Sequence, residues 1–260
     1  MNPKYEFTGE TMDCFGYTLR QIEAIENFGD VKKGDIGGWI ETEKNLSMYG
    51  NAWVSDDARV FDNARVFGNA LVSGDALVFG NALVYDDAWV FGNALVSDDA
   101  RVSGDARVFG NARVSGDALV FGNALVSGDA RVFGNARVSG NALVSSDARV
   151  FGNARVSGNA RVLGDARVYD DAWVSGDARV FGDARVFGQY DYILIGAIGS
   201  RNDATTFFRI KQGGIGVKCG CFFGTIDEFE KAVHKTHAGN EHEKAYMAAI
   251  RMVKEVMIHD

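Results

Sequence analysis

Proline, cysteine and long apolar runs are scarce in this 260-residue sequence, and each scarcity excludes a class of protein. Pro3 is the single proline, which suits a chain whose strands lie between other strands and need every N–H group. Three cysteines are too few for a disulfide framework. No apolar run is long enough for a membrane span, and residues 1–10 lack the apolar region of a signal peptide. We therefore expect no membrane partner and a cytoplasmic location, or a phage-associated one after lysis.

The composition also changes abruptly along the chain. Residues 50–187 contain no Lys, Glu, His, Cys, Pro, Ile, Met or Thr, whereas they contain 17 Asp and 13 Arg. The formal net charge of the whole chain is -8, which disfavours generic binding to nucleic-acid phosphates. We therefore expect no nucleic-acid partner, and we treat the central block as a structural unit of its own.

That block is an unbroken repeat of six residues. The frame Ala-x-Val recurs from Ala52-Trp53-Val54 to Ala184-Arg185-Val186, which makes 23 consecutive hexads. Ala and Val stand two apart and do not vary, so they point to the same side of a short strand and form the inward pair. The pair before Ala is Gly-Asn, Gly-Asp or Asp-Asp in most hexads, and these residues tolerate left-handed backbone at sharp corners. Each hexad therefore predicts one short strand and one corner of a solenoid.

An aliphatic residue followed four positions later by a small one resembles the hexapeptide-repeat motif. The resemblance implies a left-handed parallel β-helix with three hexads in each triangular coil. The segments Lys4–Glu10, Gly34–Glu41 and Asn45–Ser47 are in turn similar to the N-terminal cap of YdcK-like β-solenoid proteins. Proteins of that kind occur in bacteria and prophages and are often named as transferases, a label that follows the repeat.

The fold class that we predict is an all-β solenoid, a single-stranded parallel β-helix of about eight coils, with a cap at each end. Residues 1–45 form a small N-terminal β cap, residues 46–189 the solenoid, and residues 190–260 a C-terminal α/β cap. In the last segment we expect apolar strands at 192–198, 206–210 and 215–223, then two helices. Thr225 with Glu228, and Asn240 with Glu243, are capping-box signatures that place the helix starts.

Acyl transfer is the commonest enzymatic use of hexapeptide rods, and the resemblance implies a His general base and a cofactor cleft for it. A general base must titrate near neutral pH. The rod contains no His, and no hexad carries an inserted loop. We therefore expect no enzyme activity, no catalytic residue and no cofactor, and we keep a hexapeptide-type acyltransferase as the alternative.

Metal binding is a second alternative, through Cys219, Cys221, His234 and His237, whose side-chain types suit zinc. Cys-x-Cys is not the usual zinc knuckle, and Gly220 with Phe222 indicates a tightly packed strand. We favour buried structural cysteines and exposed helix histidines, and hence no metal ligand. A third option, binding of ice or glycan through a flat face, lacks the Thr arrays of a regular ice-binding surface, because the rod has no Thr.

The outward positions carry the strongest functional signal. The residue after Val is aromatic in 12 of the 23 hexads, a large apolar exposure for a monomer. With 18 residues in a coil, parallel columns would share one face, with Asp129, Asp147, Asp165 and Asp183 pairing with neighbouring Arg side chains. The candidate interaction face consists of Arg131, Phe133, Arg149, Phe151, Arg167, Tyr169, Arg185 and Phe187. Another side, containing Ser139, Ser157 and Ser175, is rich in Ser.

Arg and aromatic side chains are enriched at protein interfaces. The functional hypothesis is therefore a non-catalytic scaffold or binding rod, of prophage origin, whose partner is another protein or a second copy of the chain in a homo-oligomer. A self-satisfied surface left by recent repeat duplication is the competing interpretation of the same columns.

Overall fold

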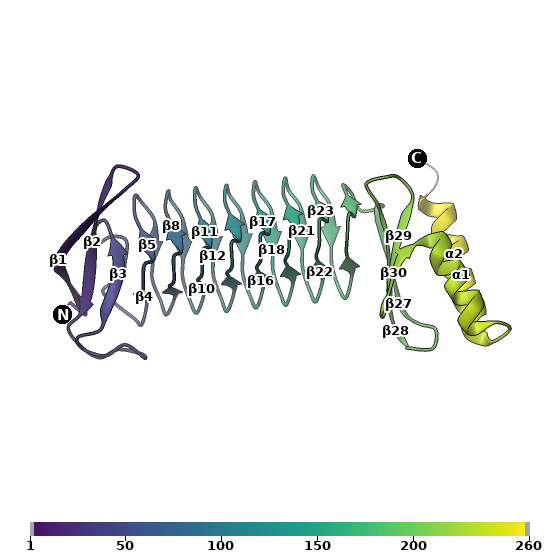
Figure 1. Cartoon of the computed structure of the whole chain (residues 1–260), viewed down its shortest axis with the longest axis horizontal. Coiled ribbons are helices and arrows are strands. Elements are labelled where there is room, and N and C mark those ends of the chain that lie inside the picture. The colour runs from purple at the N-terminus through teal and green to yellow at the C-terminus, as the bar shows by residue number, and fades with distance from the viewer. Residues whose placement is uncertain (1–2, 258–260) are drawn as a thin grey trace.

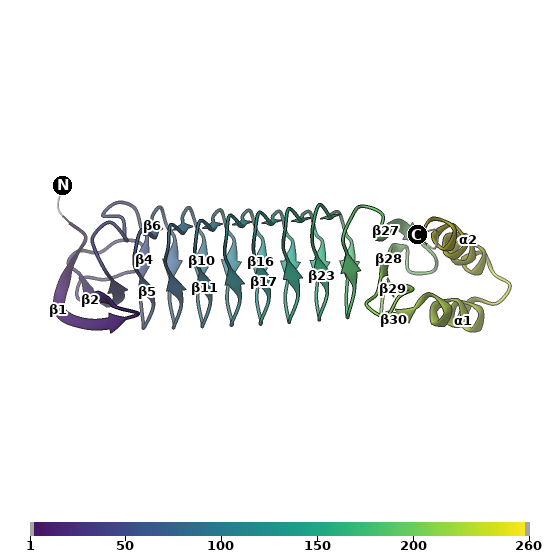
Figure 2. The same cartoon turned by 90° about the horizontal axis from the view of Figure 1, so that it is seen from above.

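The protein is a straight solenoid with a small domain at each end. The computed structural model describes residues 3–257. Figures 1 and 2 show the N-terminal strands, the stack of coils, and the C-terminal strands and helices following one another along the rod. The coils are made of 23 two-residue strands, from β4 (Trp53–Val54) to β26 (Arg185–Val186), and each consists of one outward residue and its following Val.

Each solenoid strand pairs in parallel with the strand three places further on. Val132 of β17 (Arg131–Val132) pairs with Val150 of β20 (Arg149–Val150), so partners lie 18 residues apart. The pairing produces three sheets that run the length of the rod, with 11, 8 and 7 strands. The predicted coil of three hexads and the count of about eight coils are confirmed, whereas the left hand stays a prediction.

The inward assignment is also confirmed. The Ala and Val of every hexad, from Ala52 to Val186, have no exposed surface. They form one continuous cluster along the rod axis. Because three Ala and three Val fill each coil, side-chain size at these positions sets the width of the interior.

The corners bring successive coils into backbone contact. Gly68 has φ +73°, and a Cβ there would lie 2.9 Å from the backbone nitrogen of Asp86 in the next coil. Asp86 itself has φ +60°, and its carboxylate accepts a hydrogen bond from the backbone N–H of Gly104 at 3.3 Å. The left-handed corner residue is thus mostly Gly, and at Asp56, Asp86 and Asp98 it is an Asp whose carboxylate bonds to the coil that follows.

The second corner residue of many hexads also forms side-chain hydrogen bonds between coils, which its tolerance of left-handed backbone does not predict. Its Asn side chains form ladders along the rod, each amide donating to the residue 18 positions later. Such ladders satisfy polar groups at an exposed corner without water. They run through Asn51–Asn69–Asp87, Asn93–Asn111–Asp129, Asn123–Asn141–Asn159–Asp177 and Asn135–Asn153–Asp171.

The N-terminal cap continues the longest sheet. Strands β1 (Tyr5–Cys14) and β2 (Tyr17–Ala24) form an antiparallel pair. Strand β3 (Ile36–Ile40) pairs with β2 antiparallel and with β5 (Arg59–Val60) in parallel. Asn45 is fully buried, and its amide donates to the carbonyls of Asp62 and Ala64 at 3.0 and 2.9 Å. The cap thereby satisfies carbonyl groups that the first coil would otherwise leave open.

The Lys4 side chain is buried at the N-terminal end of the rod, against the first coil. Its ammonium group donates to the carbonyls of Ala52 at 2.7 Å and Gly50 at 3.1 Å, and it lies 4.7 Å from the centre of the Phe28 ring. Burial lowers the pKa of Lys4 to about 8, against a smaller opposing effect of Glu26. A cation held this deeply costs folding free energy as long as it stays protonated.

The sign of the pH dependence follows from this pKa. Between about pH 8 and 10 the unfolded chain holds a proton that the folded chain has lost, so stability rises with pH. We expect a gain of about 2 kcal/mol between pH 7.5 and 9.5, measured by urea denaturation. Burial raises the pKa of the neighbouring Tyr5 phenol as well, and the resulting loss of stability starts only above this window.

The variant Lys4→Met should lose the gain, whereas Lys44→Met, at an exposed position, should keep it. An equal gain in both variants would contradict the assignment to Lys4.

The C-terminal cap is a four-stranded antiparallel sheet covered by two helices. The strands are β27 (Tyr192–Ile198), β28 (Asp203–Arg209), β29 (Ile215–Cys219) and β30 (Phe222–Thr225), followed by α1 (Ile226–His237) and α2 (Glu241–Met257). The predicted single strand at 215–223 is in fact a hairpin, because Gly220, with φ +54°, turns the chain.

The first predicted capping box is confirmed, because Thr225 and Glu228 bond to each other's backbone. The second is only half formed. Asn240 accepts from the N–H of Glu243 at 3.1 Å, but the Glu243 carboxylate binds the N–H of Gly239 instead of that of Asn240. The reason is local, since the turn between the helices brings the Gly239 N–H to that carboxylate.

Candidate functional site

The Arg column lies on the 11-stranded sheet. Arg131, Arg149, Arg167 and Arg185 occupy the same register position in β17, β20, β23 (Arg167–Val168) and β26. The prediction that these four side chains share one face is confirmed. Arg113 of β14 (Arg113–Val114) pairs with Arg131 and extends the column by one coil. It was not part of the predicted face because Ser115, and not an aromatic residue, follows Val114.

The aromatic column beside it is stacked. Phe133 and Phe151 have ring centres 5.0 Å apart and an interplanar angle of 1°, and Phe151 and Tyr169 are 4.8 Å apart at 6°. Phe187 ends the column in an edge contact with Tyr169 at 3.9 Å. Burial in the stack raises the pKa of the Tyr169 phenol, although Arg185 and Arg167 act against it. Stacking covers the faces of the two inner rings, while Phe133 and Phe187 remain exposed.

A polar groove of about 410 Å³ runs along the same face. Four cationic groups and three carboxylates line it, so it presents both signs of charge. Its floor and walls belong to the last coils, and Lys211 and Gln212, from the turn after β28, close its end. The lining residues are Asp147, Arg149, Asp165, Arg167, Asp183, Arg185, Lys211 and Gln212.

The predicted pairing of the Asp and Arg columns is wrong. Within residues 3–257, no salt bridge joins an Arg of this column to an Asp. The Arg185 guanidinium instead donates to the backbone carbonyls of Asp165, Asp183 and Ala184 at 3.0, 2.9 and 2.8 Å. Corner carbonyls lie within its reach, and bonding to them leaves the carboxylates in water. Within the described residues the carboxylates of this face therefore form no salt bridge with the Arg column, whereas the Arg185 guanidinium is bonded to the backbone of the rod.

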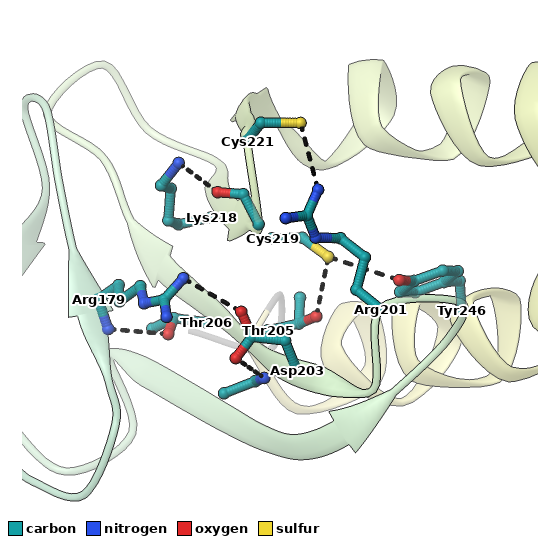
Figure 3. A network of polar contacts seen from close by, with 11 residues as sticks. Arg179, Arg201, Asp203, Thr205, Thr206, Lys218, Cys219, Cys221 and Tyr246 are labelled. Atoms are coloured by element: carbon teal, nitrogen blue, oxygen red, sulfur yellow. Dashed lines mark hydrogen bonds and ion pairs between the residues drawn. The ribbon is translucent and has the colours of Figure 1, made fainter.

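The four residues considered for zinc do not converge. Cys219 is buried, and its sulfur contacts the Thr205 hydroxyl at 3.2 Å and the Tyr246 hydroxyl at 3.7 Å (Figure 3). Cys221 is exposed, contrary to expectation, and the Arg201 guanidinium lies 3.8 Å from its sulfur. His234 pairs with Glu243 at 2.5 Å.

His237 packs near Tyr246, with ring centres 5.7 Å apart. Nowhere between residues 3 and 257 do three or more His, Cys, Asp or Glu side chains form a group that could hold a metal ion. Nor does either helix in this range have the length and apolar character to span a membrane.

The part of the chain that resembles known proteins includes the solenoid. The repeat described as the YdcK beta solenoid repeat matches residues 58–74, 100–116, 112–128, 124–140, 130–146, 148–164 and 154–170. The chain is also 53% identical over 38 residues to a protein of Escherichia coli K12 named "Uncharacterized acetyltransferase YdcK". That similarity covers 15% of this chain and 12% of the relative, far less than two thirds of either.

Proposed function

We propose that this chain, a β-solenoid protein built on YdcK-type repeats, is a non-catalytic binding rod that presents its Arg and aromatic columns to another protein or to a second copy of itself. One observation carries the proposal. Over the last coils a stacked aromatic column, an Arg column without carboxylate partners and a groove of mixed charge share one face. Stacked rings, and a guanidinium that is already bonded as that of Arg185 is, lose little entropy when a partner covers them.

The double variant Arg149→Glu with Phe151→Ser tests this face. It reverses a charge and interrupts the stack in one coil, so recovery of protein partners in a pull-down and any self-association in light scattering should fall at least about tenfold, as for a disrupted interface centre. The matched control is Arg155→Glu, the same charge change at an exposed position of the 7-stranded sheet, beside Ser157. It should leave both readouts unchanged.

Circular dichroism should show the same fold in both variants. Unaltered assembly and partner recovery in the double variant would reduce the two columns to surface decoration.

The alternative is acyl transfer, which the name of the Escherichia coli relative suggests for that protein. The groove offers Asp, Arg, Lys and Gln side chains, and of these only the solvated carboxylates could act as bases. Calorimetric titration of the full chain with acetyl-CoA should show no saturable heat up to about 1 mM, a weak-binding limit. Micromolar affinity would overturn the non-enzymatic proposal and favour the transferase.

A further inference from the structure

The C-terminal cap contains a pocket unrelated to the Arg and aromatic face. It has a volume of about 390 Å³, within the range of small-molecule sites. Three parts of the cap form it: the turn between β27 and β28, the hairpin of β29 and β30, and the facing sides of both helices. The lining residues are Ser200, Arg201, Cys219, Cys221, Phe222, Phe229, Ala232, Val233, Thr236, His237 and Tyr246.

The inner part of the pocket is apolar. Phe229 and Val233 of α1 are buried, and the Phe222 and Phe229 rings have centres 5.0 Å apart. Phe229 also meets the Tyr246 ring edge-on at 5.4 Å. A ring or alkyl group that enters here would lose water contact on several sides, which favours an apolar ligand body.

Arg201 supplies the charge at this pocket. Among residues 3–257, no carboxylate lines the pocket. Asp203, the nearest acidic residue along the chain, forms an ion pair with Arg179 of the rod at 3.4 Å. For the described part of the chain, the hydrogen bond of the Arg201 guanidinium is the weak one to the Cys221 sulfur at 3.8 Å, as Figure 3 shows. Most of its N–H donors are therefore available to an anion.

Two glycines make room for this arrangement. A Cβ on Gly220 would lie 2.6 Å from Nε of Arg201, so the guanidinium lies directly over the hairpin turn. A Cβ on Gly199 would lie 2.0 Å from Cζ of Tyr246, so the phenol ring lies against the preceding turn. Because Gly220 and Gly199 have no side chain, the Arg201 guanidinium and the Tyr246 ring can both lie close to the backbone at the pocket opening.

We propose that this pocket binds a small carboxylic acid with an apolar body, its carboxylate on Arg201 and its body against Phe222, Phe229 and Val233. A guanidinium fork matches a carboxylate in a bidentate geometry. Among the lining residues that the structure describes, Arg201 is the permanent cation, His237 adds an imidazole and none is a lysine, and one guanidinium suits one negative charge better than a phosphate dianion.

Cys221 provides a local reporter for the test, because Cys14 and Cys219 are buried and Cys221 is exposed in the pocket lining. The full chain is alkylated with iodoacetamide, and adduct formation at Cys221 is followed by mass spectrometry with and without 2-naphthoate. The neutral isostere 2-naphthamide serves as the matched probe. Naphthoate should protect Cys221 at about fivefold lower concentration than naphthamide, the upper end for an exposed ion pair.

Arg201→Gln should abolish the difference between the two probes, whereas Arg251→Gln, at an exposed position of α2, should preserve it. Ala232→Trp should fill the pocket and abolish protection by both. Protection is expressed as a ratio within each variant, so a changed thiol reactivity does not affect the result. Equal protection by acid and amide, absence of protection, or protection that survives Ala232→Trp would each overturn the proposal.

Discussion

Deletion of residues 190–260 should convert the protein into aggregates or end-to-end oligomers. The deletion removes the strand that closes the last coils, where Phe208 of β28 is fully buried against the solenoid core and Thr206 accepts a hydrogen bond from the N–H of Arg179 at 2.9 Å. A bare rod end exposes apolar interior together with unpaired strand edges, and both promote association. Size-exclusion chromatography with light scattering measures the outcome.

A point variant separates loss of the seal from loss of the whole cap. Phe208→Asp in the full chain should aggregate in the same assay, because it places a charge in the buried contact between cap and rod. Tyr190→Asp is the matched control, since Tyr190 is 76% exposed, and it should behave like the parent. A soluble, monodisperse monomer of residues 1–189 would show that the last coil needs no cap.

Strict size selection in the core predicts the second large effect. Ala112 and Val114 are fully buried in the middle of the rod. Ala112→Leu should overpack one coil and lower the free energy of unfolding by about 1–3 kcal/mol. Val114→Ala should open a cavity and lower it by a similar amount, about 1–3 kcal/mol. Urea denaturation followed by circular dichroism measures both.

The control for these variants is Arg137→Leu, which places the same apolar side chain at an exposed position of the same kind of strand. Its effect should stay within about 0.5 kcal/mol, as is usual for surface substitutions. If both core variants unfold at the parental urea concentration, strict size selection at the buried Ala and Val positions is wrong.

Some features of the candidate face could be predicted from the spacing of residues in the sequence, and others could not. A period of six residues, with Ala and Val two apart, determines which side chains point inward, because alternation along a strand is a local property. The columns of Arg and aromatic residues followed once 18 residues were assumed to form a coil. Phe133, Phe151 and Tyr169 stack, since equivalent positions in successive coils bring similar side chains together. The direction of the Arg185 guanidinium did not follow, because it depends on which carbonyl groups lie within reach after the coil has closed.

The sequence by itself therefore determined the strands, the corners and both helix starts, all of which depend on neighbours a few positions away. Only the tertiary structure decided the 18-residue register, the Asn ladders, the hairpin at Gly220 and the pocket around Arg201. That pocket joins residues from 200 to 246, which come together only when the β27–β30 sheet packs under its two helices. No short-range pattern encodes such a meeting, because the free energy that holds it comes from burial of the apolar faces of the whole cap.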